Sequence, residues 1–209
     1  MLPHLQKKKI LNLILAKVCD TGWNKESIQV AAEQSKFSFD EVMTAFDNDI
    51  GEIVKFFNRC VDEEMVSGLR RGVKKKHSIR GQIKKAILLR LRILSRNKKA
   101  FKNTMAYLSF PQNLTLSLDL LYSTADSIWR SIGDKSTDFN FYTKRILLSG
   151  IYLPTLLFWI EDRSDGFRDT SAFIDRRIEN IMHIQKLRGA LKGKIEDVGG
   201  EFVRGFTKH

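Results

Sequence analysis

Apolar residues recur at intervals of three or four positions along most of this chain. In the first segment, Ile10, Ile14, Leu15 and Val18 keep this spacing up to Gly22, which places them on one face of an α-helix. Later segments repeat the spacing, whereas the alternation of apolar and polar residues that marks β-strands is missing. Only three prolines interrupt the chain. The sequence therefore predicts an all-α fold.

The N-terminal third contains a helix-turn-helix pattern. The short helix "KESIQVAAEQS" is followed by a three-residue turn and by a second short helix, "FDEVMTAFDND". Ser38 can cap the second helix, and Glu41 stands three positions later, as a capping box requires. The region between Glu33 and Glu52 holds six acids and one base, Lys36. Because DNA binding depends on cations that face phosphate, we expect the shape of a helix-turn-helix domain without specific DNA binding.

The middle of the chain is strongly basic. Residues 65–118 contain no Asp or Glu and fourteen Lys or Arg, within a chain whose formal net charge is +12. Apolar residues at helical spacing, from Ile79 to Leu94, predict an amphipathic helix with a cationic outer face, followed by a second helix over 98–108. Phe101 is the only aromatic between residues 70 and 102, so single-stranded nucleic acid is disfavoured. An anionic membrane or an acidic partner fits better.

Two later segments, 114–132 and 146–160, hold more apolar residues than one core-facing side of each helix needs. Neither is long enough to span a membrane. Two interpretations remain open: a large core with a dimer interface, or a cavity between helices that holds a lipid-like ligand. The cavity interpretation places seven side chains at helical spacing around the ligand: Leu118, Leu121, Ala125, Trp129, Leu147, Ile151 and Leu156.

The C-terminal segment, 188–209, carries one apolar stripe, and five glycines weaken its helix propensity. The stripe consists of Leu191, Ile195, Val198, Phe202 and Phe206. We therefore expect this tail to become helical on a membrane surface that accepts the stripe.

Residue patterns that would indicate catalysis or a cofactor are sparse. Cys19 and Cys60 lie in apolar helical patterns, as buried reduced thiols do. Glu179 and His183 share a helix face, but no second pair supports a metal site. There is no nucleophile elbow and no phosphate-binding glycine loop. The sequence predicts no enzyme, no cofactor and no metal.

The stretches "ADSIWRSIGDKSTDFNFYTKR" and "FIDRRIENIM" closely resemble the coenzyme Q biosynthesis accessory family, the ninth protein of the eukaryotic ubiquinone pathway and its bacterial relatives. The resemblance implies a homodimer with the fold of TetR-type regulators. That fold has an N-terminal helix-turn-helix domain, expected at residues 1–70, and a larger lipid-binding and dimerisation domain, expected at 71–187. The segment 188–209 would be a membrane-associating tail.

The resemblance also implies a function. Members of the family bind isoprenoid lipid or phospholipid and present ubiquinone precursors to a membrane-bound di-iron demethoxyubiquinone hydroxylase. A ligand-responsive DNA-binding regulator on the same fold is the alternative. The expected location is cytoplasmic and peripheral on the inner membrane, or the mitochondrial matrix if the chain is organellar.

The same resemblance suggests where the hydroxylase would dock. The interface would consist of Asp138, Asn140, Phe141, Tyr142 and Arg145. The family commonly has Trp at the position of Phe141, and buried aromatic anchors dominate many interfaces. The alternative for Phe141 is an ordinary core residue in the first turn of a helix.

Overall fold

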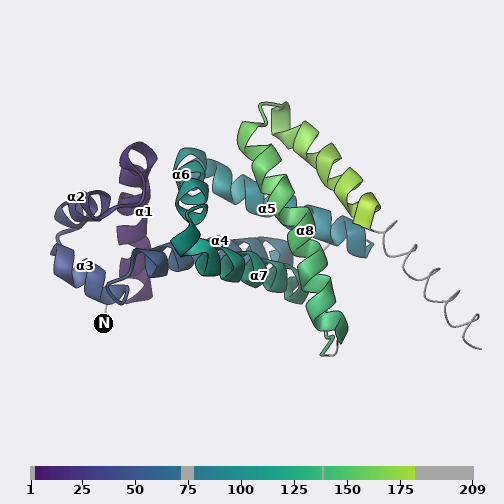
Figure 1. The fold of residues 1–209 in the computed structure, drawn as a ribbon, viewed down its shortest axis with the longest axis horizontal. Helices are drawn as coiled ribbons and strands as arrows, with labels where there is room; N and C mark the ends of the chain where they lie inside the picture. The colour runs from purple at the N-terminus through teal and green to yellow at the C-terminus, as the bar shows by residue number, and fades with distance from the viewer. Residues whose placement is uncertain (1–2, 72–77, 138, 182–209) are drawn as a thin grey trace, which may run out of the picture.

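The computed structural model describes residues 3–71, 78–137 and 139–181, and within these ranges it consists of helices and contains no strand (Figure 1). The all-α prediction is confirmed. Short 3₁₀ turns precede α6 and α7 and follow α8, and a further helix covers 168–181. The labelled helices are α1 (His4–Thr21), α2 (Lys25–Ser35), α3 (Phe39–Ala45), α4 (Ile50–Arg71), α5 (Ile79–Leu94), α6 (Lys98–Leu108), α7 (Leu114–Ser131) and α8 (Phe139–Glu161).

The N-terminal helices α1 to α3 gather at one end of the molecule (Figure 1). Asn24 caps α2 by accepting the N–H of Ser27 at 2.8 Å. Ser38 and Glu41 form the predicted capping box, because the Ser38 hydroxyl accepts the Glu41 N–H at 3.2 Å and the Glu41 carboxylate accepts the Ser38 N–H at 2.8 Å. Local sequence therefore determines where these helices begin.

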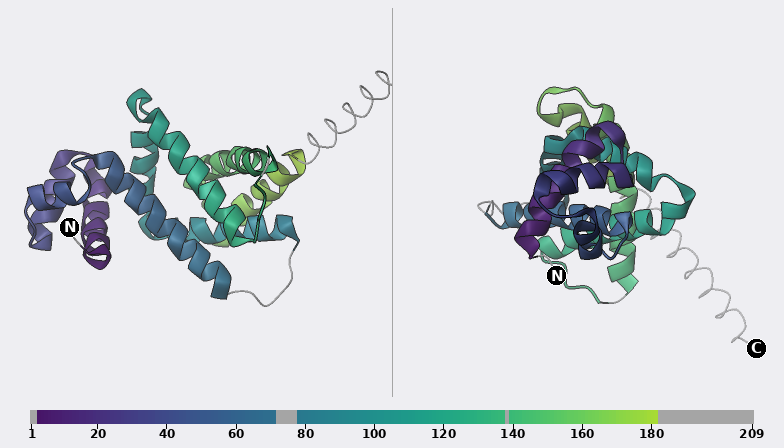
Figure 2. Two further views of the ribbon diagram at one scale, coloured as in Figure 1. Left: turned by 90° about the horizontal axis from the view of Figure 1, so that it is seen from below. Right: turned by 90° about the vertical axis from the view of Figure 1, so that its left-hand side faces the viewer.

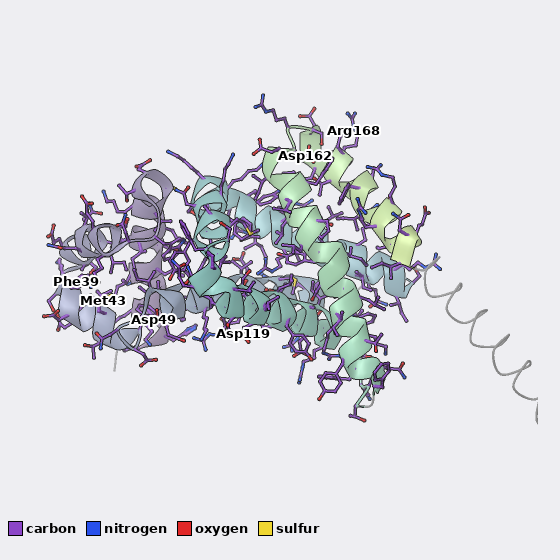
Figure 3. The ribbon with its side chains drawn as sticks, in the orientation of Figure 1. Phe39, Met43, Asp49, Asp119, Asp162 and Arg168 are labelled. Carbon is purple, nitrogen blue, oxygen red and sulfur yellow. The ribbon has the colours of Figure 1, made fainter. Side chains whose placement is uncertain are left out.

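The second helix of the helix-turn-helix, α3, turns its carboxylates to solvent. Met43 is buried beneath the helix, whereas Asp40 and Glu41, and Asp47 in the turn that follows, are exposed. Figure 3 labels Phe39 and Met43 on this helix. The surface that would have to approach DNA phosphates is therefore negative, which opposes binding.

Helix α4 connects the two ends of the molecule. It packs against α1, α5 and α7, and the left view in Figure 2 shows its length. Its buried residues, which include Ile53, Phe57 and Met65, belong to one continuous hydrophobic core. The predicted domain boundary at residue 70 falls at the C-terminal end of α4 and stays a prediction.

Many cations of the basic segment are paired with acids from other helices. The pairs include Lys84–Asp175 at 2.6 Å, Arg96–Glu64 at 2.7 Å, Lys99–Asp20 at 2.8 Å and Lys102–Glu161 at 2.8 Å. Arg90 does not belong to the expected cationic outer face, because its side chain is 1% exposed.

The turn between α8 and the helix over 168–181 depends on one carboxylate, Asp162, which Figure 3 labels near Arg168. Asp162 accepts the backbone N–H of Ser164 at 2.7 Å and that of Thr170 at 3.0 Å. The bond from Thr170 satisfies an amide group that the first turn of the helix leaves without a partner.

Within the described ranges, no helix combines the length and the apolar character that crossing a membrane requires. The five residues of the predicted membrane stripe, from Leu191 to Phe206, lie outside the described residues.

Candidate functional site

A cavity of ≈ 50 Å³ lies among α4, α5, α6, α7 and α8, and we call it the central cavity. Its lining is mostly apolar. The apolar lining consists of Val54, Phe57, Leu94, Phe101, Met105, Leu108, Leu120, Leu121, Leu153 and Leu156, and the polar lining of Asn58, Arg90, Thr104, Ser117, Thr124 and Tyr152. An apolar cavity with a few convergent polar groups is typical of a small-molecule site. Its volume suits one or two water molecules in this conformation.

Hydrogen bonds centred on Arg90 occupy the polar end of the central cavity. The Arg90 Nε donates to Asp62 Oδ1 at 2.7 Å, and Nη2 donates to Thr124 Oγ1 at 3.2 Å and to Asn58 Oδ1. The remaining contact is from Nη1 to the hydroxyl oxygen of Tyr152. We call these five residues the Arg90 cluster. It holds α4, α5, α7 and α8 to one another at the cavity.

Two groups of the Arg90 cluster, the guanidinium of Arg90 and the phenol of Tyr152, have shifted pKa values. Burial by itself lowers the pKa of Arg90, but Tyr152 and Asp62 outweigh it and leave the pKa of the guanidinium raised. Burial raises the pKa of the Tyr152 phenol far above its usual value. At neutral pH the guanidinium is therefore charged and the phenol keeps its proton.

The position of Arg90 among apolar residues indicates a buried arginine, although helical spacing alone predicted only a cationic outer face here. Ile83, Ile87, Arg90 and Leu94 share the core-facing spacing of α5, and the other three are apolar. An arginine at a core position requires a buried acceptor, because an unpaired charge in the interior is strongly unfavourable. Asp62 meets that requirement, although it lies 28 residues earlier in the chain.

The seven side chains that helical spacing predicts around a lipid do not all lie at one cavity in the structure. Leu121 and Leu156 line the central cavity. The other five lie elsewhere: Leu118 is 58% exposed, Ala125 and Ile151 are buried outside the lining, and Trp129 and Leu147 are half-buried. Spacing identifies the side chains that share a helix face but not the neighbour that this face meets.

The turn between α7 and α8 is held by a second set of charged and polar side chains, Asp126, Asp134, Ser136, Lys144 and Arg145, which we call the turn cluster. Arg145 binds Asp126 at 2.7 Å and Asp134 at 3.2 Å. Lys144 Nζ donates to Asp134 at 2.7 Å and to Ser136 at 2.8 Å. All five residues belong to the stretch "ADSIWRSIGDKSTDFNFYTKR" that carries the family resemblance. These residues of the stretch therefore bind one another and set the geometry of the turn.

The turn cluster presents aromatic side chains at the start of α8. Phe139 is 82% exposed and Tyr142 is 58% exposed, whereas Phe141 is half-buried. The guanidinium of Arg145 lies 3.4 Å from the centre of the Phe141 ring, and its Nη1 donates to the Phe141 carbonyl at 2.8 Å. Phe141 packs edge-on against Tyr142, with 5.1 Å between ring centres.

The five residues expected at the partner interface divide into different groups. Asn140 and Tyr142 are exposed, and Phe141 is half-buried. Arg145 is 1% exposed, so the expectation that its side chain contacts a partner does not fit this arrangement, in which it orients Phe141. Asp138 lies outside the described residues.

Asp134 makes the turn cluster sensitive to acid. Burial by itself would raise the pKa of Asp134, but hydrogen bonds from Lys144, Ser136 and Arg145 outweigh it and hold the pKa at about 2, below the ordinary 3.8. A carboxylate with a depressed pKa contributes stability that is present above the ordinary value and lost as the pH falls toward the depressed one. We therefore expect thermal stability to fall between about pH 4 and pH 2. Thermal unfolding followed by circular dichroism should show a smaller loss for Asp134→Asn, and an unchanged pH profile would contradict the assignment.

No pairing of Glu179 with His183 can be described, because His183 lies outside the described residues. A different group, His4, Cys60 and Glu63, has ligand atoms within 4.8 Å of one another. The ammonium of Lys8 lies 3.2 Å from Glu63 and neutralises its carboxylate. Burial raises the pKa of the Cys60 thiol, and both described cysteines are free thiols.

Comparisons with known proteins find similarity along most of this chain. The COQ9 family model matches residues 114–185, a range that includes α7, the turn cluster and α8. The rat and human proteins named ubiquinone biosynthesis protein COQ9, mitochondrial, are 33% and 30% identical to this chain over 204 residues. That alignment covers 94% of this chain and 64% and 63% of the two relatives. The chain thus spans a little less than two thirds of their length.

Two solved structures share the fold. The TetR transcriptional regulator from Nitrosomonas europaea has a TM-score of 0.65 at 18% identity, covering 84% of this chain and 97% of the regulator. A putative TetR-family transcriptional regulator from Mesorhizobium loti has a TM-score of 0.54 at 14% identity, covering 86% of this chain and 96% of the regulator. At this identity the likeness concerns the fold alone, and the expected TetR-type fold is confirmed.

The resemblance noted in the sequence is therefore confirmed: this chain is similar to the rat and human proteins named ubiquinone biosynthesis protein COQ9 over 94% of its length, and it has the helical fold of TetR-type regulators.

Proposed function

We propose that this chain is a lipid-binding accessory protein of ubiquinone biosynthesis. It takes up an isoprenoid quinone precursor at the membrane and presents it to the di-iron demethoxyubiquinone hydroxylase, without catalysing a reaction itself. The central cavity is the observation that carries this proposal, because it combines an apolar lining with a few buried polar groups. The relatives are named ubiquinone biosynthesis proteins, which supports the pathway.

A ligand-responsive DNA-binding regulator is the weaker alternative. The fold is the same, but α3 and the turn that follows it expose Asp40, Glu41 and Asp47, and duplex binding depends mainly on phosphate neutralisation. A titration with duplex DNA across a range of salt concentrations separates the two functions. Specific binding in the nanomolar range would overturn the accessory function.

The ligand is tested by analysis of the purified full-length chain. Native mass spectrometry and extraction with organic solvent should both reveal co-purifying isoprenoid or phospholipid. Stripped protein should also take up ubiquinone from liposomes. A chain that carries no lipid and extracts none from liposomes would contradict the proposed function.

The proposed docking site for the hydroxylase is the aromatic surface at the start of α8. Tyr142→Ala should weaken hydroxylase binding by at least about tenfold, since aromatic anchors at interface centres are typically worth 2 kcal/mol or more. Its stability should change little, because the side chain is 58% exposed. Phe110→Ala is the matched control, an aromatic that is 54% exposed at another place in the fold. Surface plasmon resonance with the purified hydroxylase measures both, and equal losses would argue against this docking site.

Three further proposals concern location and assembly. The relatives are named mitochondrial, and we place this chain on the inner membrane as a peripheral protein, in the mitochondrial matrix or in the cytoplasm of a bacterium. The segment 188–209 would make the membrane contact. The chain would assemble as a homodimer through its last long helices. Flotation with liposomes and light scattering test these proposals.

A further inference from the structure

Among the described residues, the hydroxyl of Tyr152 accepts a hydrogen bond but donates none. Its hydroxyl oxygen accepts a hydrogen bond from Arg90, so the proton must point elsewhere. In the part of the chain that the structure describes, this hydroxyl donates no hydrogen bond. The side chain is 2% exposed and lines the central cavity. A buried donor without an acceptor is unfavourable, and an acceptor inside the cavity would remove that cost.

The charge at this end of the central cavity is already balanced. Arg90 is the one charged side chain of the lining, and its Nε lies 2.7 Å from Asp62. Its Nη2 is directed at Asn58 and Thr124. A phosphate or carboxylate entering the cavity would lose its hydration without gaining an unpaired cation, which is strongly unfavourable in a buried site.

Size constrains how the head group enters. A volume of ≈ 50 Å³ is smaller than the 150 Å³ of a cavity known to bind benzene. An oxygen atom fits beside Tyr152, but a ring requires side chains to move. Leu153 belongs to the lining and is also 39% exposed, so this side chain stands between the cavity and the surface beside α8. The ring and tail would enter there by displacing Leu153.

We propose that the central cavity selects an uncharged head group that carries a hydrogen-bond acceptor, such as the carbonyl of a quinone ring, and that Tyr152 is the residue that donates to it. This inference rests on the proposed function, in which the cavity receives a lipid. It adds the recognition element and excludes prenyl phosphates and anionic phospholipids as the preferred ligands.

Three probes with the same geranyl tail test the proposal: a ubiquinone, geranylbenzene, which has a ring without acceptors, and geranyl phosphate. Isothermal titration calorimetry with the full-length chain should show about tenfold tighter binding of the ubiquinone than of the other two, the effect of one hydrogen bond of about 1.4 kcal/mol. Tyr152→Phe should abolish this preference and leave geranylbenzene binding unchanged. Tyr122→Phe, which alters a tyrosine outside the lining, should bind all three like the wild type.

The ratio of two affinities in one variant does not depend on how much of it is folded, so a loss of stability in Tyr152→Phe does not obscure the result. The infrared carbonyl stretch of bound ubiquinone should be lower in the wild type than in Tyr152→Phe. Equal affinity for ubiquinone and geranylbenzene in the wild type, or tightest binding of geranyl phosphate, would overturn this inference and leave lipid binding intact. Failure of all three probes to bind would overturn the proposed function as well.

Discussion

Replacement of Arg90 by methionine is expected to lower the free energy of unfolding by about 3–5 kcal/mol, because it leaves the carboxylate of Asp62 buried without its cation. The Arg90–Asp62 pair joins α5 to α4 at 2.7 Å, and the two side chains are 2% and 8% exposed. Methionine fills a similar volume, so the loss reports the charge rather than a cavity. Urea denaturation followed by circular dichroism measures the change.

Arg96→Met is the matched control for this experiment. Arg96 also forms an ion pair of 2.7 Å with an acid of α4, Glu64, but the two side chains are 62% and 42% exposed. Exposed pairs contribute about 0.2–1 kcal/mol, so the two variants should differ clearly. The double variant Arg90→Met/Asp62→Leu should recover much of the loss, because it removes the stranded charge. Similar losses for Arg90→Met and Arg96→Met would contradict the burial of the Arg90 cluster.

Replacement of Arg145 by methionine is expected to have the second large effect, a loss of about 3 kcal/mol together with loss of hydroxylase binding. Arg145 is 1% exposed and lies between Asp126 and Asp134. Without it the two carboxylates repel each other, and Phe141 loses the guanidinium that packs over its ring. The aromatic surface should then lose its geometry although Tyr142 itself is unchanged.

Arg130 provides the control on the same carboxylate. It binds Asp126 at 2.6 Å but is 67% exposed, so Arg130→Met should cost about 0.3–0.5 kcal/mol and leave hydroxylase binding unchanged. Urea denaturation and surface plasmon resonance measure the two properties separately. If Arg145→Met kept full hydroxylase affinity, the turn cluster would have no part in positioning the docking surface.

The stretch "GDKSTDFNFYTKR" shows how far a motif can be interpreted before its contacts are known. Its resemblance to a family predicted an aromatic surface at Phe141 and Tyr142, and the structure exposes Tyr142 and half-buries Phe141. Arg145 belongs to the same motif and is buried. The motif thus contains both exposed residues and the buried residues that orient them, and spacing alone does not separate the two.

The helices, their caps and the acidic surface of α3 were determined by the sequence alone, because they depend on local interactions. The capping box joins Ser38 and Glu41, which are three positions apart, and apolar spacing marks the buried side of each helix. These features depend on residues within a turn or two of each other, so the chain encodes them directly.

Only the tertiary structure decided which buried faces meet and where polar groups gather between them. Arg90 reaches Asp62 across 28 positions and Tyr152 across 62, and two of the seven side chains chosen by spacing line the central cavity. A helix face is defined by its own periodicity, but its partner is defined by the packing of several helices at once. The position of the cavity and of its buried ion pair depends on how all these helices pack together, and the sequence of one helix does not contain that information.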